Sequence, residues 1–281
     1  MAEFTAADVG KLREMTGAGL MDCKKALTET KGDVSAAVDY LRKKGTVSAA
    51  KKASRQTREG AIVQYIQPGA GTGLLVEINC ETDFVARNEI FGAFCAEVAR
   101  KLAAKATLAS LEADRVAAVA KIGENIQIPR FVRYEVQGNG MVAAYIHTGA
   151  KVGVLVEVGA AKEGTVGQED FKQLVRDITL QIAAGNPVFI SREEIPAATL
   201  AKEREIAAEQ VKNKPPQAIA KIIEGKLEKF FQGCCLLDQG FVKRNSEVSL
   251  KEHIGGIAKQ LGDDIVIRRF ARFQVGESPA A

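Results

Sequence analysis

The residues that could do chemistry in this chain are few and scattered. The two histidines, His147 and His253, lie outside any spacing typical of metal ligands, and none of the five cysteines forms a C-x-x-C pair. The glycine cluster at residues 69–73 lies between two expected strands, whereas a phosphate-binding loop leads from a strand into a helix. No serine or cysteine lies in a recognisable nucleophile motif, and no carboxylate pair is marked out for acid–base catalysis. The sequence therefore predicts a binding protein that is not an enzyme and has no cofactor or metal.

The composition predicts a globular protein of the cytoplasm. The 281 residues are 46% apolar, which is enough for a core divided among one to three domains. We expect no signal peptide, and no stretch approaches the roughly 18 apolar residues of a membrane span. The odd number of cysteines favours reduced thiols. A net charge of +4 does not by itself indicate a nucleic-acid partner.

Residues 1–45 are expected to form a small module of three short helices. Thr5 and Asp8 have the spacing of a helix N-cap, and a glycine-rich break separates the first helix from the second. The third helix should begin after Asp33 and end at Gly45, because glycine is common just after the last helical residue. Such a module has only a small core.

Residues 46–59 are interpreted as a linker. The overlapping stretch 42–58 carries seven basic residues and no acidic one. A solvated linker and a basic contact strip for an acidic partner are both open interpretations of this charge pattern.

The rest of the chain contains an internal repeat. Residues 60–78 recur at 140–158, 80 positions later, with matching glycine, aliphatic and tyrosine positions. Each copy is typical of a strand, a glycine-containing turn and a second strand, followed by a helix with apolar residues about 3.6 positions apart. The predicted fold class is therefore α+β, with two related subdomains at residues 60–139 and 140–276, each a hairpin packed against helices.

The two copies differ in the loop between the second strand and the helix. Residues 159–168 make a polar, glycine-rich loop, whereas residues 79–88 contain Phe84 and Val85. Apolar side chains are unusual in a connecting loop, and such loops carry function more often than packing. Phe84 is thus either a contact residue for a partner or a residue of its own core, with Thr82 capping the helix.

The last third of the second subdomain contains more helices. Residues 195–231 are typical of a helical hairpin, with a narrow apolar stripe on the first arm and a stronger one on the second. A hairpin that protrudes from the body and two ordinary packed helices are both consistent with this pattern. A helix at residues 250–261 and a strand at residues 264–275 follow, and residues 277–281 are expected to fray.

Two segments are similar to the signatures of a known family. One is LREMTGAGLMDCKKAL at residues 12–27, and the other is VEINCETDFVA at residues 76–86. Both resemble the bacterial translation elongation factor Ts family, and shorter matches at residues 121–126, at His147 and at residues 240–242 keep the family's order. The resemblance covers nearly the whole chain, so it is far more specific than a lone glycine pattern.

The resemblance implies a fold and a partner. The implied fold has an N-terminal module like a ubiquitin-associated domain, a core of two subdomains and a protruding coiled-coil hairpin. The implied partner is the GTPase elongation factor Tu, whose GDP is displaced without covalent chemistry, and self-association is left open. In that family the loop that matches Asp83 and Phe84 inserts its aromatic side chain between partner helices near the magnesium of the nucleotide.

The resemblance also implies which residues contact this partner. They are Arg13, Leu20, Met21, Lys24, Thr82, Asp83, Phe84, Val85, Ile122, Gly123, His147, Phe241 and Val242. Lys243 departs from the pattern, because the family often has methionine there. The alternative function is a basic protein that binds RNA or the ribosome through residues 42–58, and such binding would fall steeply with salt.

Overall fold

The computed structural model describes residues 4–211 and 215–277. The α-helices are α1 (Ala6–Thr16), α2 (Leu20–Glu29), α3 (Val34–Lys52), α4 (Asp83–Ala86), α5 (Glu89–Ala103), α6 (Glu112–Ile122), α7 (Glu163–Val166), α8 (Glu169–Gly185), α9 (Ala197–Glu209), α10 (Pro216–Cys234) and α11 (Leu250–Leu261). The strands are β1 (Glu59–Ile66), β2 (Thr72–Cys80), β3 (Gln127–Glu135), β4 (Gly140–Ile146), β5 (Val152–Ala160) and β6 (Ile265–Gln274). Short 3-10 turns lie at Ala109–Leu111, Arg192–Glu194, Leu236–Asp238 and Val242–Arg244. The predicted α+β class is confirmed.

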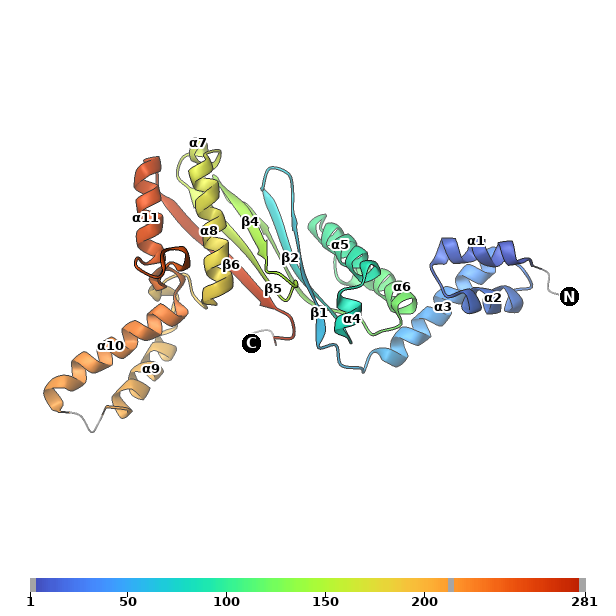
Figure 1. Cartoon of the computed structure of the whole chain (residues 1–281), viewed down its shortest axis with the longest axis horizontal. Helices are drawn as coiled ribbons and strands as arrows, with labels where there is room; N and C mark the ends of the chain where they lie inside the picture. The colour runs from blue at the N-terminus through green and yellow to red at the C-terminus, as the bar shows by residue number, and fades with distance from the viewer. Residues whose placement is uncertain (1–3, 212–214, 278–281) are drawn as a thin grey trace.

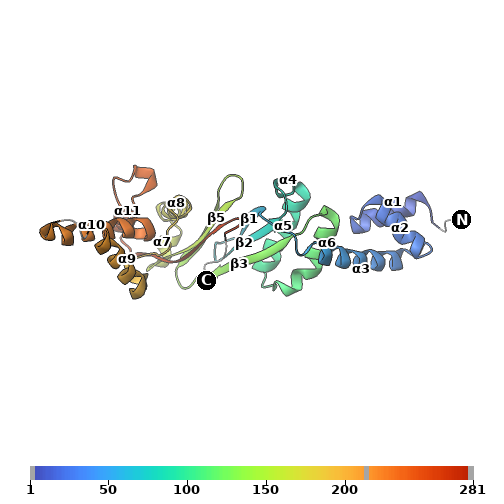
Figure 2. The same cartoon turned by 90° about the horizontal axis from the view of Figure 1, so that it is seen from below.

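The molecule is elongated, with α1–α3 at one end and the α9–α10 hairpin at the other (Figure 1). Two three-stranded antiparallel sheets lie between them, in the strand orders β1-β2-β3 and β4-β5-β6. Helices α5 and α6 lie on one side of the pair of sheets and α8 and α11 on the other (Figures 1 and 2). Helices α9 and α10 extend away from the sheets, as expected for a protruding hairpin. The division into subdomains at residues 139 and 140 stays a prediction.

The inner faces of the two sheets pack on each other. Equivalent positions of the 80-residue repeat meet in this contact. Its buried residues are Ile62, Leu75, Tyr134, Val142 and Leu155. The backbone N–H of Ile62 donates to the carbonyl of Ala150 at 2.7 Å, and that of Val142 donates to Ala70 at 2.9 Å. A Cβ on Gly73 would lie only 2.4 Å from Val142, so this position requires glycine for the sheets to meet. The repeat therefore gives a two-fold arrangement of the sheets.

A buried glutamate joins the sheets in each half. Glu77 pairs with Arg130 at 2.6 Å, and Glu157 pairs with Arg268 at 3.0 Å and Arg269 at 2.7 Å. Each carboxylate also accepts a backbone N–H from the segment after the last strand of the other sheet, at 3.0 and 2.8 Å respectively. Buried charges are tolerated when they are paired and hydrogen-bonded in this way, so these residues fix the relative position of the two halves.

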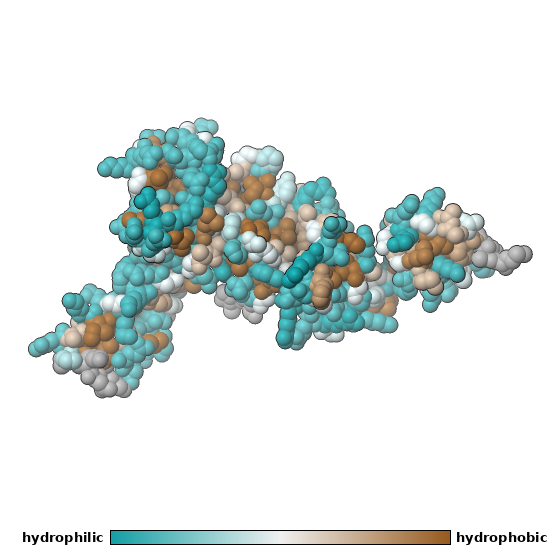
Figure 3. All heavy atoms as spheres, viewed as in Figure 1, coloured by the Kyte–Doolittle hydropathy of each residue, from teal (hydrophilic) through white to brown (hydrophobic). Residues whose placement is uncertain are grey.

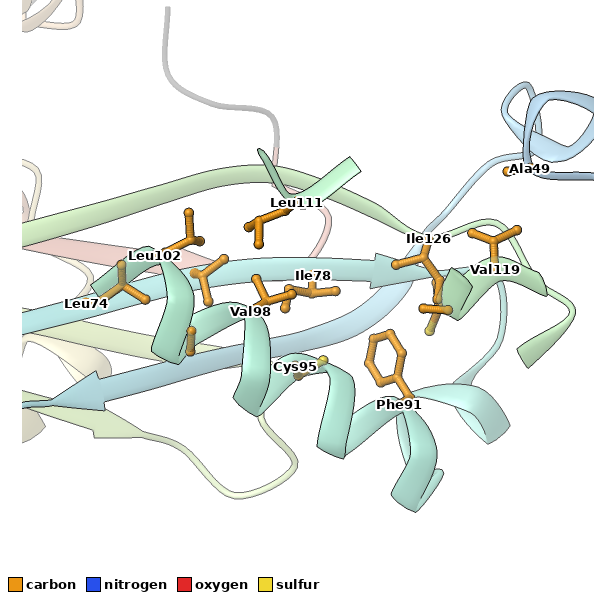
Figure 4. Close-up of a cluster of buried hydrophobic side chains, with 14 residues drawn as sticks. Ala49, Leu74, Ile78, Phe91, Cys95, Val98, Leu102, Leu111, Val119 and Ile126 are labelled. Atoms are coloured by element: carbon orange, nitrogen blue, oxygen red, sulfur yellow. The ribbon is translucent and has the colours of Figure 1, made fainter. Parts of the chain in front are cut away.

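Each sheet also packs against its own helices, and this forms one further core in each half. In the first, the side chains of Phe91, Cys95 and Val98 on α5 lie beside β2 side chains such as Ile78 (Figure 4). The second core has the same plan, with Phe171 on α8 at the position of Phe91 in the repeat. The apolar helix spacing predicted from the sequence is therefore confirmed in both halves.

The prediction that the third helix ends at Gly45 is wrong. Helix α3 continues to Lys52, so half of the expected linker at residues 46–59 is helical. Gly45 is buried inside the helix, and a Cβ there would lie 3.4 Å from Ala120 of α6, so the glycine allows close packing rather than ending the helix. Ala49 enters the first core from the same helix. The C-terminal part of α3 therefore holds the N-terminal helices to the body.

Other predicted element ends match the structure. Thr5 and Asp8 form a complete capping box at the start of α1, and the Asp33 side chain caps α3. The helical hairpin covers the expected range, although residues 212–214 of its turn lie outside the described residues. The same holds for residues 278–281 of the tail that is expected to fray.

Candidate partner-binding site

Phe84 lies on α4, a single helical turn that begins just after β2. Thr82 caps this turn, because its hydroxyl accepts a 3.3 Å hydrogen bond from the backbone N–H of Val85. Val85 and Ala86 pack against the first core, whereas Phe84 is 83% exposed. The interpretation that Phe84 folds into its own core is therefore wrong for the free protein. An exposed aromatic ring on a capped turn has a large apolar area to offer to a partner.

Two glutamates fix the start of α4 to the segment that follows α6. The Glu124 carboxylate accepts the backbone N–H of Glu81 at 2.9 Å, the N–H of Thr82 at 3.0 Å and the Thr82 hydroxyl at 2.6 Å. The Glu81 carboxylate in turn accepts the N–H of Asn125 at 2.6 Å. Gly123 ends α6 in the left-handed conformation, with φ of 92°, and the chain then turns toward α4. These charge-assisted hydrogen bonds hold the base of α4 in one position.

The turn between β4 and β5 carries His147 and lies at the same end of the first sheet. Lys151 in this turn donates 3.1 Å to the carbonyl of residue 60 and pairs with Glu59 at the start of β1. Glu59 lies opposite Cys80 in the register of β1 and β2, directly before the segment that leads into α4. His147 is exposed, and its Nδ1 lies 3.0 Å from the Tyr145 hydroxyl. The second half thus places a polar ring in a turn at the same end of the first sheet as the α4 turn.

The N-terminal candidates lie on the surface of α1 and α2. All of them are exposed, namely Arg13, Leu20, Met21 and Lys24. Met21 is 72% exposed, and apolar surface shows over this module in Figure 3. The turn between α1 and α2 faces α6, because a Cβ on Gly17 would lie 3.2 Å from the Lys121 side chain. The module therefore lies beside the end of α6 that anchors α4.

Several predicted contact residues point into a core instead. Val85 and Ile122 are partly buried against the first core. Phe241 is only 2% exposed and stacks on His253 of α11, with ring centroids 4.1 Å apart. The second core encloses the Phe241 ring, so this side chain is not exposed in the free protein, and its contact with a partner stays a prediction. The neighbouring Val242 is 40% exposed and available at the surface.

The candidates therefore fall into two regions. The α4 turn, Gly123 and His147 lie toward one end of the first sheet, and the N-terminal residues lie beyond α6 at the end of the molecule (Figure 1). Val242 belongs elsewhere: its N–H donates 2.9 Å to Gln181 of α8, beside the second core. Figure 1 shows α4 and α8 on opposite sides of the two sheets. A partner would therefore have to span both halves of the molecule to reach both regions.

Comparison with known proteins identifies the family. The family model described as Elongation factor TS matches residues 81–277. An elongation factor Ts of Symbiobacterium thermophilum is 46% identical over 286 aligned residues, which cover 99% of this chain and 93% of that protein. Elongation factor Ts of Trichlorobacter lovleyi is 43% identical, covering 98% and 93% of the two chains, and that of Nitratidesulfovibrio vulgaris is 39% identical, covering 99% and 98%.

The chain belongs to the elongation factor Ts family. This membership supports a role as a translation elongation factor in protein biosynthesis. In this elongation factor Ts chain, the two halves of the repeat differ at the candidate site. Helix α7 occupies the position of α4, but Gly164 stands in place of Phe84 and Lys162 in place of Thr82. The second half therefore has the turn without the exposed aromatic side chain.

The sequence did not indicate the residues that hold α4. Glu81 and Glu124 carry the hydrogen bonds described above, and the Asn125 side chain ties the same segment to the end of α3 by donating 2.9 Å to the carbonyl of Arg55. The signal was present, because both glutamates lie inside segments that match the family. Their role could not be assigned from sequence, since 43 positions separate them.

The described residues contain few groups suited to covalent chemistry. They include no cluster of three or more histidine, cysteine, aspartate or glutamate side chains able to hold a metal ion. Burial raises the pKa of the Cys80 thiol to about 12, so this cysteine beside α4 is a weak nucleophile. Within residues 4–211 and 215–277, no helix is long and apolar enough to cross a membrane.

Proposed function

We propose that this chain is a guanine-nucleotide exchange factor for the GTPase elongation factor Tu. The observation that carries the proposal is Phe84, which is exposed on a turn capped by Thr82 and anchored by Glu124. Burial of a phenylalanine ring in a partner yields about 1.5–3 kcal/mol. Because α4 is already held in place, little of this free energy is lost in ordering the loop.

The proposed mechanism acts on the magnesium ion of the nucleotide. A GTPase holds GDP through backbone N–H groups, a lysine and Mg²⁺. Mg²⁺ requires near-ideal octahedral geometry, so a small displacement of its ligands weakens nucleotide binding. Insertion of Phe84 between partner helices near this ion would supply that displacement. Asp83 precedes Phe84 on the same turn and pairs with Arg87 at 3.2 Å, so insertion of the turn would carry this carboxylate into the interface as well.

Thermodynamic reciprocity completes the exchange cycle. If the bound factor weakens the affinity of the GTPase for GDP, then GDP weakens the affinity for the factor by the same ratio. GTP in excess can therefore fill the vacated site and release the factor. Each step is a change of non-covalent contacts, so the factor acts without a catalytic group, metal or cofactor of its own.

The other candidates would set the orientation of Phe84. Met21 and Leu20 offer exposed apolar side chains on the N-terminal module, which is held against α6. His147 offers a polar ring from the second half. Three elements that are joined by hydrogen bonds and packing would hold the partner at several points, and such preorganisation lowers the entropic cost of binding.

The decisive experiment is the release of a fluorescent GDP from elongation factor Tu, followed by stopped flow with substoichiometric amounts of this protein. We expect strong acceleration that requires only trace factor. A folded protein that gives no acceleration would refute the proposal. The same sample should then be tested for RNA binding at increasing salt. Binding that weakens steeply as the salt concentration rises would favour the alternative function. Three of the seven basic residues at 42–58 already pair with carboxylates of the chain, which weakens that alternative.

A further inference from the structure

Cys234 and Cys235 are adjacent cysteines where α10 joins the second half of the molecule. Their sulfur atoms lie 3.7 Å apart. In a continuing helix with 3.6 residues per turn, neighbouring side chains would point about 100° apart. Cys235 is where the helix ends, with φ of −100° and ψ of 119°, so this 100° spacing does not apply to the pair, and the sulfurs meet at contact distance. The chain thus holds a preformed pair of thiols.

We propose that Cys234 and Cys235 form a dithiol site for thiophilic species that need only two protein sulfurs, with trivalent arsenic as the chemical class. Sulfur ligands select soft acceptors. For bonds of about 2.3 Å and angles of about 100–120°, two sulfurs on one centre stand roughly 3.5–4 Å apart, and the observed separation lies in this range. A structural zinc ion would need four ligands, whereas the described residues contain no cluster of three or more histidine, cysteine, aspartate or glutamate side chains able to hold a metal ion.

The thiols have properties that favour this class over oxidation or alkylation. Burial raises the pKa of both, that of Cys235 to about 12, so both are protonated at neutral pH. Disulfide exchange and alkylation begin from a thiolate and are therefore slow here. An organoarsenic(III) oxide forms two As–S bonds and loses its As=O bond. The two thiol protons leave with that oxygen as water, so no oxidant or reductant is needed.

Access distinguishes this pair from the other cysteines. Cys234 is partly exposed and leads to the buried Cys235, whereas Cys23, Cys80 and Cys95 are all buried in cores. The carbonyl of Cys234 also accepts the backbone N–H of residues 188 and 189 at 2.8 and 3.0 Å. A group bound by both sulfurs would therefore sit at the joint that holds the helical hairpin.

Phenylarsine oxide tests the site directly, because it supplies its own third substituent and needs two sulfurs. We expect native mass spectrometry of the full chain to show one phenylarsenic adduct that survives excess monothiol and is removed by a dithiol. Cys234→Ser and Cys235→Ser should each abolish the monothiol-resistant adduct. Should Cys235→Ser fail to fold, the partly exposed Cys234→Ser decides the matter alone.

Three outcomes would overturn the assignment. The wild-type protein could form no adduct, or it could form one that excess monothiol removes, which indicates attachment through a single sulfur. The adduct could also persist in Cys234→Ser, which would locate it away from the Cys234–Cys235 pair. Circular dichroism of each variant confirms that the comparison is made on folded protein. None of these readouts depends on nucleotide exchange, so the result is independent of the proposed function.

Discussion

Replacement of Phe84 by alanine should separate binding from folding. The side chain is 83% exposed, so the free protein has gained little from burying it. Exposed substitutions away from special features usually change stability by within about 0.5 kcal/mol, and alanine is a favourable residue in a helical turn. The Thr82 cap and the Glu124 hydrogen bonds do not involve the ring. We therefore expect Phe84→Ala to unfold at nearly the wild-type denaturant concentration.

The effect on exchange should be much larger. Complete burial of the ring yields about 1.5–3 kcal/mol, and because 83% of the residue is still exposed, about 1.2–2.5 kcal/mol remains to be gained on the partner. At 1.4 kcal/mol per factor of ten, the variant should lose about 7- to 60-fold in the second-order rate constant for GDP release. Stopped-flow release of fluorescent GDP from elongation factor Tu measures this constant.

Two control variants make the Phe84 result interpretable. Val266→Ala removes another exposed apolar side chain, 53% exposed on β6, and should leave exchange unchanged. Phe91→Ala opens the first core and should cost about 3–5 kcal/mol of stability. A loss of stability in Phe84→Ala similar to that in Phe91→Ala would show that Phe84 belongs to the core. Unchanged exchange would refute the role of Phe84 as the inserted residue.

Three more variants probe the supporting structure. Glu124→Gln removes the charge that holds α4, so GDP release should slow several-fold while the circular dichroism spectrum stays native; normal exchange would show that the anchor is dispensable. Deletion of residues 1–45 should weaken binding to elongation factor Tu in a titration but leave the two sheets folded, and full-rate exchange would contradict the assigned role of the module. For Glu157, burial opposes ionisation, but hydrogen bonds from the N–H of residue 137 and from Arg268 and Arg269 outweigh it and lower its pKa below 4.5. The stability that depends on this carboxylate is present above pH 4.5 and is lost as the pH falls through the lowered pKa. In urea unfolding, the difference in stability between wild type and Glu157→Gln should therefore shrink from pH 7 to pH 3. A difference that stays constant over this range would contradict the linkage.

The repeat made much of the fold predictable. Glycines and apolar residues 80 positions apart identified both hairpins and their helices, because sheet packing requires Gly73 and its counterpart to be small. Strand β3 was missed, since Pro129 and the arginines of this strand break the usual alternation. The end of α3 was misplaced because a glycine at a close helix contact has the same sequence signal as a C-cap, and only Ala120 of α6 distinguishes the two.

The candidate site was predictable in part for similar reasons. The contrast between Phe84 and Gly164 could be read from the sequence, but exposure depends on the direction of a side chain on one helical turn. Phe241 shows that a match to the family does not predict exposure. It lies in a matching segment, yet the ring of His253 and the second core enclose its side chain. Contacts between distant segments, such as Glu124 with Thr82, have no local signal.

The two halves also show that the α4 turn and the Phe84 side chain are separable. Both halves hold the start of the turn with a distant carboxylate: Glu124 accepts from Thr82 at 3.0 Å, and Asp263 accepts the N–H of Lys162 at 3.0 Å. In the second half this anchor is kept although Gly164 has no side chain to position. The anchor is therefore part of how this α+β unit ends its second strand, and it does not require an aromatic residue. An exposed ring on such a turn adds nothing that the fold needs, which is the physical reason to look for its use outside the molecule.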